Sequence, residues 1–121
     1  MRPLALIVAT PDPERLRGAL ALAAAQAALG GSASLFLQLD AVALLRAPIC
    51  APQDAAHRAA GLPDLATLME EARAIGVRLI ACQSGLALAG LSATDLPPGV
   101  ETAGPVALIQ GLSEDARLLF V

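Results

Sequence analysis

Short apolar runs alternate with longer helical patterns along the 121-residue chain. The run at 4–9 is continuously apolar, which is typical of a strand covered on both faces, and two further strands are expected at 34–39 and 77–81. Extended segments at 100–103 and 117–121 bring the expected strands to five. Helices are expected at 14–29, 62–75, 83–91 and 106–112, with a short helix or turn at 40–45 and an irregular loop containing a partial helix at 47–61.

The alternation of strands and helices predicts one α/β domain over residues 1–121, built on a mainly parallel five-stranded sheet. The helix at 14–29 carries no charge after Arg17, and a helix that is apolar all round is buried all round. A sheet in so small a domain covers only one side of this helix, so we expect the other side to meet another subunit. The face of the helix at 62–75 that is expected to enter the core consists of Leu65, Leu68, Met69, Ala72 and Ile75.

Residues 18–39 contain no charged side chain and are long enough to span a bilayer. Alanine dominates this stretch, however, and Gly30-Gly31 predicts a helix end followed by a strand. We therefore expect two buried elements and no membrane span. The short apolar run at the N-terminus leads into a segment rich in proline and charge, which does not fit a signal peptide. A cytoplasmic protein with reduced thiols is expected.

Charge and composition exclude several classes of partner and cofactor. The net charge is −3 without any basic run, and aromatic residues make up 2% of the chain, so a nucleic-acid surface is not expected. Two cysteines and one histidine fit no zinc pattern. No Rossmann or P-loop glycine pattern is present, so the sequence predicts no metal and no nucleotide cofactor.

Cys82 occupies the most informative position, because it ends the third expected strand and precedes a short helix. The carboxyl ends of parallel strands border the crevice where ligands bind, and helix amides favour the thiolate, which is the attacking form. Cys82 is therefore the candidate catalytic residue, with the backbone amides of Gln83, Ser84 and Gly85 as candidate binding groups. The alternative is a small buried hydrophobe. Ser84 lacks the glycine two residues earlier that a hydrolase elbow needs, which favours a helix-capping role.

Other polar residues have weaker patterns. Cys50 lies in a proline-flanked loop and is a candidate second thiol that meets Cys82, or an incidental one. His57 is a candidate base for either thiol, or a solvated loop residue. Asp12 and Asp40 follow the first two strands, so they border the crevice or cap the elements that follow.

Several segments together resemble the DsrE/DsrF-like family, also called YchN-like or peroxiredoxin-like. The matching segments are Gly76 to Ser84 with Gly90-Leu91, Asp12 to Arg15, Leu35 to Asp40, Gly61 to Leu65, and Asp95-Leu96 with Gly99 to Glu101 and Ala103-Gly104. The resemblance covers nearly the whole chain. It departs at Ala41, where many relatives have glycine, and at Gln83-Ser84-Gly85, where a methionine-containing run is usual.

The resemblance implies a three-layer α/β/α fold and assembly into homo- or hetero-oligomers, as trimers or hexamers. It also implies that Cys82 accepts sulfane sulfur as a persulfide and passes it from a donor protein to an acceptor protein, in the manner of a sulfurtransferase. Two other functions stay open. One is a non-catalytic oligomeric binding or scaffold module, and the other is a thiol redox protein in which Cys50 and Cys82 form a disulfide.

Overall fold

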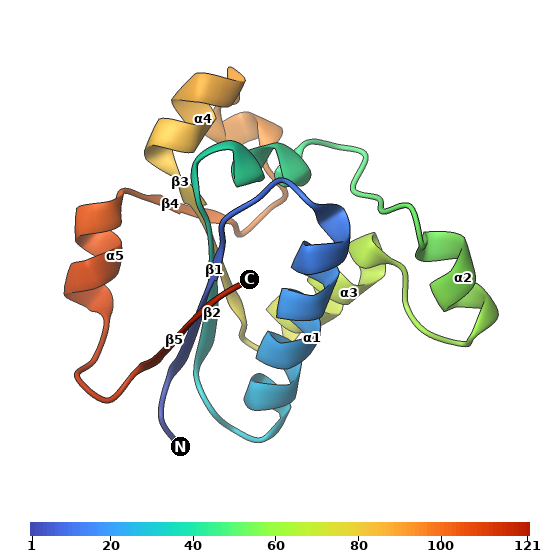
Figure 1. Ribbon diagram of the computed structural model, residues 1–121, viewed down its shortest axis with the longest axis horizontal. Coiled ribbons are helices and arrows are strands. Elements are labelled where there is room, and N and C mark those ends of the chain that lie inside the picture. The colour runs from blue at the N-terminus through green and yellow to red at the C-terminus, as the bar shows by residue number, and fades with distance from the viewer.

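The computed structural model describes all 121 residues and contains a five-stranded sheet in which every pairing is parallel (Figure 1). The strand order is β4-β3-β2-β1-β5, so β4 and β5 form the two edges. This arrangement confirms the predicted α/β class. The strands are β1 (Leu4–Val8), β2 (Ala33–Leu37), β3 (Arg78–Cys82), β4 (Glu101–Ala103) and β5 (Arg117–Phe120).

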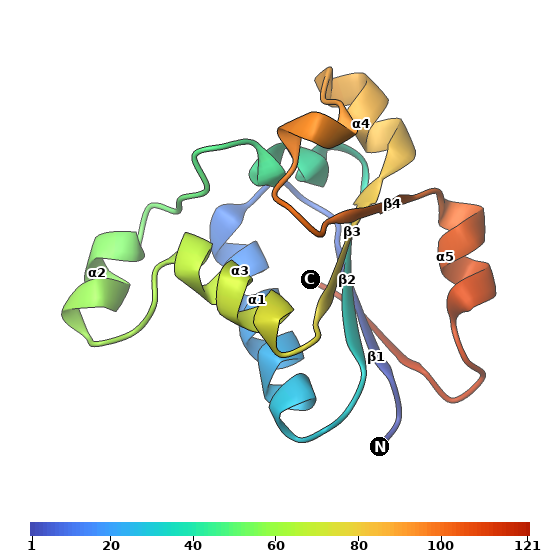
Figure 2. The same cartoon turned by 180° about the vertical axis from the view of Figure 1, so that it is seen from behind.

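Helices lie on both faces of the sheet, with α1 and α3 on one side and α5 on the other (Figure 2). They are α1 (Pro13–Ala28), α2 (Asp54–Ala59), α3 (Leu65–Ala74), α4 (Gln83–Ala89) and α5 (Pro105–Gly111), with two 3₁₀ helices, η1 (Leu39–Leu45) and η2 (Ala93–Asp95). All expected elements are present, with boundaries shifted by a few residues. None of the helices combines the length and apolar character that crossing a membrane requires.

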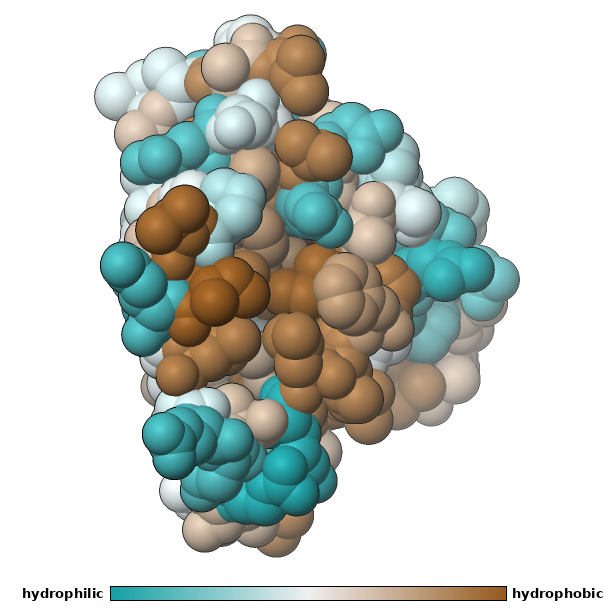
Figure 3. Space-filling view, turned by 60° about the vertical axis from the view of Figure 1, so that its left-hand side comes forward, coloured by the Kyte–Doolittle hydropathy of each residue, from teal (hydrophilic) through white to brown (hydrophobic).

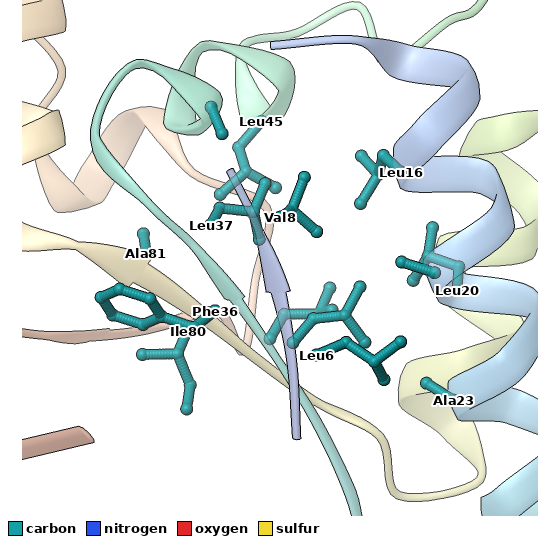
Figure 4. Packing of buried hydrophobic residues seen from close by; sticks show 14 of the residues in the cluster. Leu6, Val8, Leu16, Leu20, Ala23, Phe36, Leu37, Leu45, Ile80 and Ala81 are labelled. Atoms are coloured by element: carbon teal, nitrogen blue, oxygen red, sulfur yellow. The ribbon is translucent and has the colours of Figure 1, made fainter. Parts of the chain in front are cut away.

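The main core lies between the sheet and α1. Leu6 of β1 points toward Leu16 and Leu20 of α1, while Phe36 and Ile80 point to the opposite face of the sheet (Figure 4). All five of these side chains are buried. Because side chains alternate across a strand, a strand needs apolar residues at every position only when both faces are covered. The continuous apolar run of β1 is explained by this double burial.

The sheet covers only one side of α1, as expected, and Gly18, Ala21, Leu22 and Ala25 on its other side are exposed in the single chain. One sequence expectation about the helices needs correction, and it concerns Ile75, which is 50% exposed. Ile75 is the residue at which α3 ends, so the chain has already left the helical spiral that directs the other apolar residues into the core.

Asp12 caps the first helix, as one of the two sequence interpretations expected. Its carboxylate accepts a hydrogen bond from the N–H of Glu14 at 2.9 Å and a longer one from the N–H of Arg15 at 3.4 Å. These amides have no partner within the helix, so the carboxylate satisfies them and also opposes the positive end of the helix dipole.

The sheet face under α5 is only partly covered. Ile109 of α5 and Phe120 of β5 are 62% and 69% exposed, and both line a small cavity of about 130 Å³ together with buried Ile7 and Phe36. Figure 3 shows a continuous hydrophobic patch on this side of the molecule. We define the α5–β5 face as Val106, Leu108, Ile109, Leu118 and Phe120. A patch of this kind marks an interaction surface in soluble proteins.

The long loop before α3 is fastened to α1 by a buried ion pair. Asp54 Oδ1 accepts a hydrogen bond from Arg17 Nη2 at 2.7 Å and another from the N–H of Leu65 at 3.0 Å, while its Oδ2 accepts one from the N–H of Ala51 at 3.0 Å. Three segments of the chain therefore meet at one carboxylate. The loop is anchored at Asp54 rather than free along its length.

Replacing Asp54 by asparagine is expected to lower the melting temperature at pH 7 and to flatten its fall in acid. The hydrogen bond from Ala51, together with Arg17 and Leu65, lowers the pKa of Asp54 from its ordinary value of 3.8 to about 2. The unfolded chain therefore binds the proton first, so the stabilisation is present above about pH 4 and is lost as the pH falls toward about 2. Thermal melts between pH 2 and pH 7 test this, with Glu70→Gln in α3 as an exposed control. Parallel acid limbs for wild type and Asp54→Asn would contradict it.

Candidate functional site

Cys82 lies where the sequence places it, at the junction between β3 and α4. It is the last residue of β3, and its extended backbone (φ −66°, ψ 123°) occupies the N-cap position of α4. No side chain caps this helix. The strand ends at the carboxyl edge of the parallel sheet, so Cys82 has the topological position from which open α/β sheets contact ligands.

The role of Cys82 as an attacking thiol predicts a sulfur that solvent can reach, and this prediction is wrong for the single chain. Cys82 is 0% exposed and belongs to the main hydrophobic cluster, and the walls of the main cavities do not include it. Cys82 is still paired with Ala103 of β4, so it is part of the sheet and not of the loop that follows it. The physical reason is that the carboxyl edge is covered, because η1 packs on both α4 and β3.

The contact between η1 and α4 is unusually close at Gly85. Gly85 is buried, and a Cβ at this position would collide with the backbone carbonyl of Leu39. Leu39 itself has a φ of 49°, in the left-handed region that non-glycine residues rarely adopt. A strained residue thus lies against a glycine at the edge where Cys82 ends its strand. The sequence shows the glycine but has no signal for the conformation of Leu39.

The remaining residues of the turn are outside this contact. Gln83 and Ser84 are both exposed. The expected capping role of Ser84 is wrong, because Cys82 takes the N-cap position and Ser84 lies within the first turn of α4, where its side chain makes no capping bond.

Cys50, His57 and Asp40 are not gathered around Cys82 in any main cavity. Cys50 is an exposed free thiol, and no disulfide joins it to Cys82. His57 is half-buried in α2 and lines a separate cavity beside α1. Asp40 is exposed in the first turn of η1. No three His, Cys, Asp or Glu side chains come together in a way that could hold a metal ion.

The parallel sheet and the β3–α4 junction together define the class of this protein. It is a parallel α/β domain that has a cysteine where its third strand meets a short helix. The chain belongs to the DsrE/DsrF-like family, whose model matches residues 3–121. No curated protein matches the sequence.

Two solved structures share the fold over the full length of both chains. The ychN protein from E. coli matches with a TM-score of 0.73 at 23% sequence identity. A protein of unknown function from Methanobacterium thermoautotrophicum, MTH1491, matches with a TM-score of 0.72 at 17% identity. At these identities the similarity shows a common fold, and it does not extend to a common activity.

Proposed function

We propose that this protein is an oligomeric carrier of sulfane sulfur that holds the sulfur as a persulfide on Cys82. The observation that carries the proposal is the position of Cys82 at the β3–α4 junction of a DsrE/DsrF-like domain. Such a carrier works in the cytoplasm, where thiols stay reduced, and needs a donor and an acceptor protein.

The transfer step is a thiol–persulfide exchange that needs no oxidant. The Cys82 thiolate attacks the terminal sulfur of a donor persulfide, R–S–SH, so that a new S–S bond forms at Cys82 and the donor S–S bond breaks. The donor leaves as the thiolate R–S⁻, and Cys82 becomes Cys–S–SH. Repetition of the same exchange by an acceptor thiolate returns Cys82 to the thiolate form.

The buried position of Cys82 adds a condition to this proposal, because a thiolate must reach its substrate to attack it. The segment that packs on α4 and β3 is η1, and its first residue, Leu39, has a strained backbone. Strained conformations persist only where surrounding contacts hold them. Movement of η1 away from Gly85 is therefore the opening that the proposal requires, and it keeps the persulfide shielded from other thiols between transfers.

Assembly with further copies is the other part of the proposal. The α5–β5 face is apolar and exposed, and β5 is an edge strand with one unpaired side. Exposed edges and apolar patches favour association. A second copy of this chain is the occupant that we assign to the face.

Incubation with glutathione persulfide is expected to add the mass of one sulfur atom to Cys82. Peptide mass spectrometry under non-reducing conditions locates the adduct. Cys82→Ser should lose it and Cys50→Ser should retain it, since Cys50 serves as the exposed matched thiol. An adduct found only on Cys50 would show that Cys82 does not carry the sulfur, and it would overturn the proposal.

A non-catalytic oligomeric binding module is a second candidate function, and the complete burial of Cys82 favours it. The rate of alkylation separates the two. A thiol without any opening motion should react with iodoacetamide at least about a hundredfold more slowly than exposed Cys50, because reaction must await local unfolding. If a persulfide donor or acceptor protein accelerates the reaction of Cys82 with iodoacetamide, the function as a non-catalytic binding module is excluded.

A further inference from the structure

Arg46 joins the end of η1 to the end of α4. It is the residue that follows η1, and its Nη2 donates a hydrogen bond to the backbone carbonyl of Ala89 at 2.9 Å. Ala89 is the last residue of α4, 43 positions further along the chain. At the other end of the same two elements, the carbonyl of Leu39 lies against Gly85. The start of η1 is therefore held against the start of α4, and the end of η1 against the end of α4.

The carbonyl of Ala89 is well suited to an arginine donor. The last carbonyls of a helix have no partner within the helix and carry the negative end of its dipole. Gly90 ends α4 in a left-handed conformation (φ 67°), and its N–H bonds to the carbonyls of Leu86 and Ala87 rather than to that of Ala89. Arg46 gives this carbonyl both a donor and a positive charge. Because Arg46 is exposed, the bond can break without leaving a buried charge unpaired.

Few other contacts hold α4 in place. Gly85 and Leu86 are its two buried residues, whereas Leu88 is 75% exposed. The elements on which α4 mainly packs are η1 and β3, and β3 is the strand from which α4 directly continues. An element with little buried surface separates from the rest of a fold at a low cost in free energy. The contacts with η1 therefore decide how often α4 leaves its position.

We infer that Arg46 holds the cover over Cys82 closed, because its bond to Ala89 keeps α4 and η1 together, and that breaking this bond opens the β3–α4 junction. Arg46 is a positioning residue, since it bonds to a backbone carbonyl of α4 and acts on the thiol only through that helix. The inference rests on the proposed function, in which the thiol must become reachable. No persulfide is needed to observe the opening.

Replacing Arg46 by methionine is expected to raise the iodoacetamide reaction rate of Cys82 by about three- to tenfold, because the closed state loses one hydrogen bond from a charged donor. Methionine keeps an unbranched side chain and removes every donor. Peptide mass spectrometry measures the rate. Amide hydrogen exchange followed by NMR should become faster in α4 by a similar factor and stay unchanged in α1. Arg46→Lys should stay within about twofold of the wild-type rate, since an ammonium can replace a guanidinium that makes a single hydrogen bond.

Arg2→Met is the matched control, because Arg2 also donates an exposed hydrogen bond to a backbone carbonyl, that of Asp115. These two residues precede β1 and β5, at the edge of the parallel sheet opposite Cys82. The control should leave the Cys82 rate and the exchange in α4 unchanged. An unchanged Cys82 rate in Arg46→Met, an equal increase in Arg2→Met, or equal rates for Arg46→Lys and Arg46→Met would each overturn the inference.

The alkylation result is separate from the persulfide experiment. A sulfur adduct on Cys82 together with an unchanged alkylation rate in Arg46→Met would refute the role of Arg46 and leave the carrier function intact. Faster alkylation in Arg46→Met without any sulfur adduct on Cys82 would support the role of Arg46 and refute the carrier function.

Discussion

Replacing Ile109 and Phe120 together by glutamate is expected to convert the proposed oligomer into a folded monomer with the mass of one chain, 12.2 kDa. Both side chains are exposed on the α5–β5 face and line one cavity there, while neither belongs to the core. Burying an unpaired carboxylate in an apolar contact costs several kcal/mol, and each interface would contain more than one. Size-exclusion chromatography with light scattering measures the mass.

Two control variants distinguish the α5–β5 face from other apolar surfaces. Leu22→Glu changes the exposed side of α1, which the sequence pattern indicated as a subunit contact, and Leu88→Glu changes an exposed leucine of α4. Both should keep the wild-type mass if the α5–β5 face makes the assembly. If only Leu22→Glu dissociates the oligomer, the interface lies on α1 and not on the α5–β5 face. If the wild-type protein is a monomer, the oligomeric part of the proposed function is wrong.

Gly85→Ala is expected to destabilise the fold and to expose Cys82. The added methyl group would collide with the carbonyl of Leu39, whose backbone is already in an unfavourable region with a φ of 49°. Overpacking of this kind costs about 1–3 kcal/mol, which corresponds to a drop in melting temperature of several degrees. Displacement of η1 should also raise the iodoacetamide reaction rate of Cys82 by at least about tenfold, measured well below the melting temperature.

Gly18→Ala is the matched control for this substitution, because it is also a helical glycine but its added Cβ meets no neighbour. It should stabilise the protein by about 0.5–1 kcal/mol, since alanine is the better helix former, and should leave the Cys82 reaction unchanged. Equal melting temperatures and equal Cys82 rates for Gly85→Ala and wild type would show that η1 is not the cover of this thiol.

Local patterns were sufficient to predict most of the architecture. The continuous apolar run at 4–9 identified β1, because a strand covered on both faces cannot alternate with polar residues, and the mostly apolar segments at 34–39 and 77–81 identified β2 and β3. Asp12 was correctly considered as a cap, since its position before an acidic first turn satisfies helix amides. The helix expected at 62–75 stops before Gly76, whose φ of 101° lies in the left-handed region that a side chain would oppose.

The hydrophobic pattern of the sequence could not predict contacts between segments that are distant along the chain. Arg17 was visible as the last charge of an alanine-rich helix and Asp54 as an acid in an irregular loop, but nothing in the sequence joined them into a buried pair 37 positions apart. The close approach of Leu39 to Gly85 is of the same kind. Such contacts depend on the path of the chain in space and have no local period.

The order of the strands and helices, and the place of Cys82 at a junction between them, were determined by the sequence alone, because hydrophobic period and turn residues act over a few neighbouring positions. Only the tertiary structure decided that Cys82 is covered, with 0% of its surface exposed. A residue at the end of a strand is open or closed according to which other segment packs over that edge, and in this protein η1, about forty positions away, packs on both α4 and β3 there.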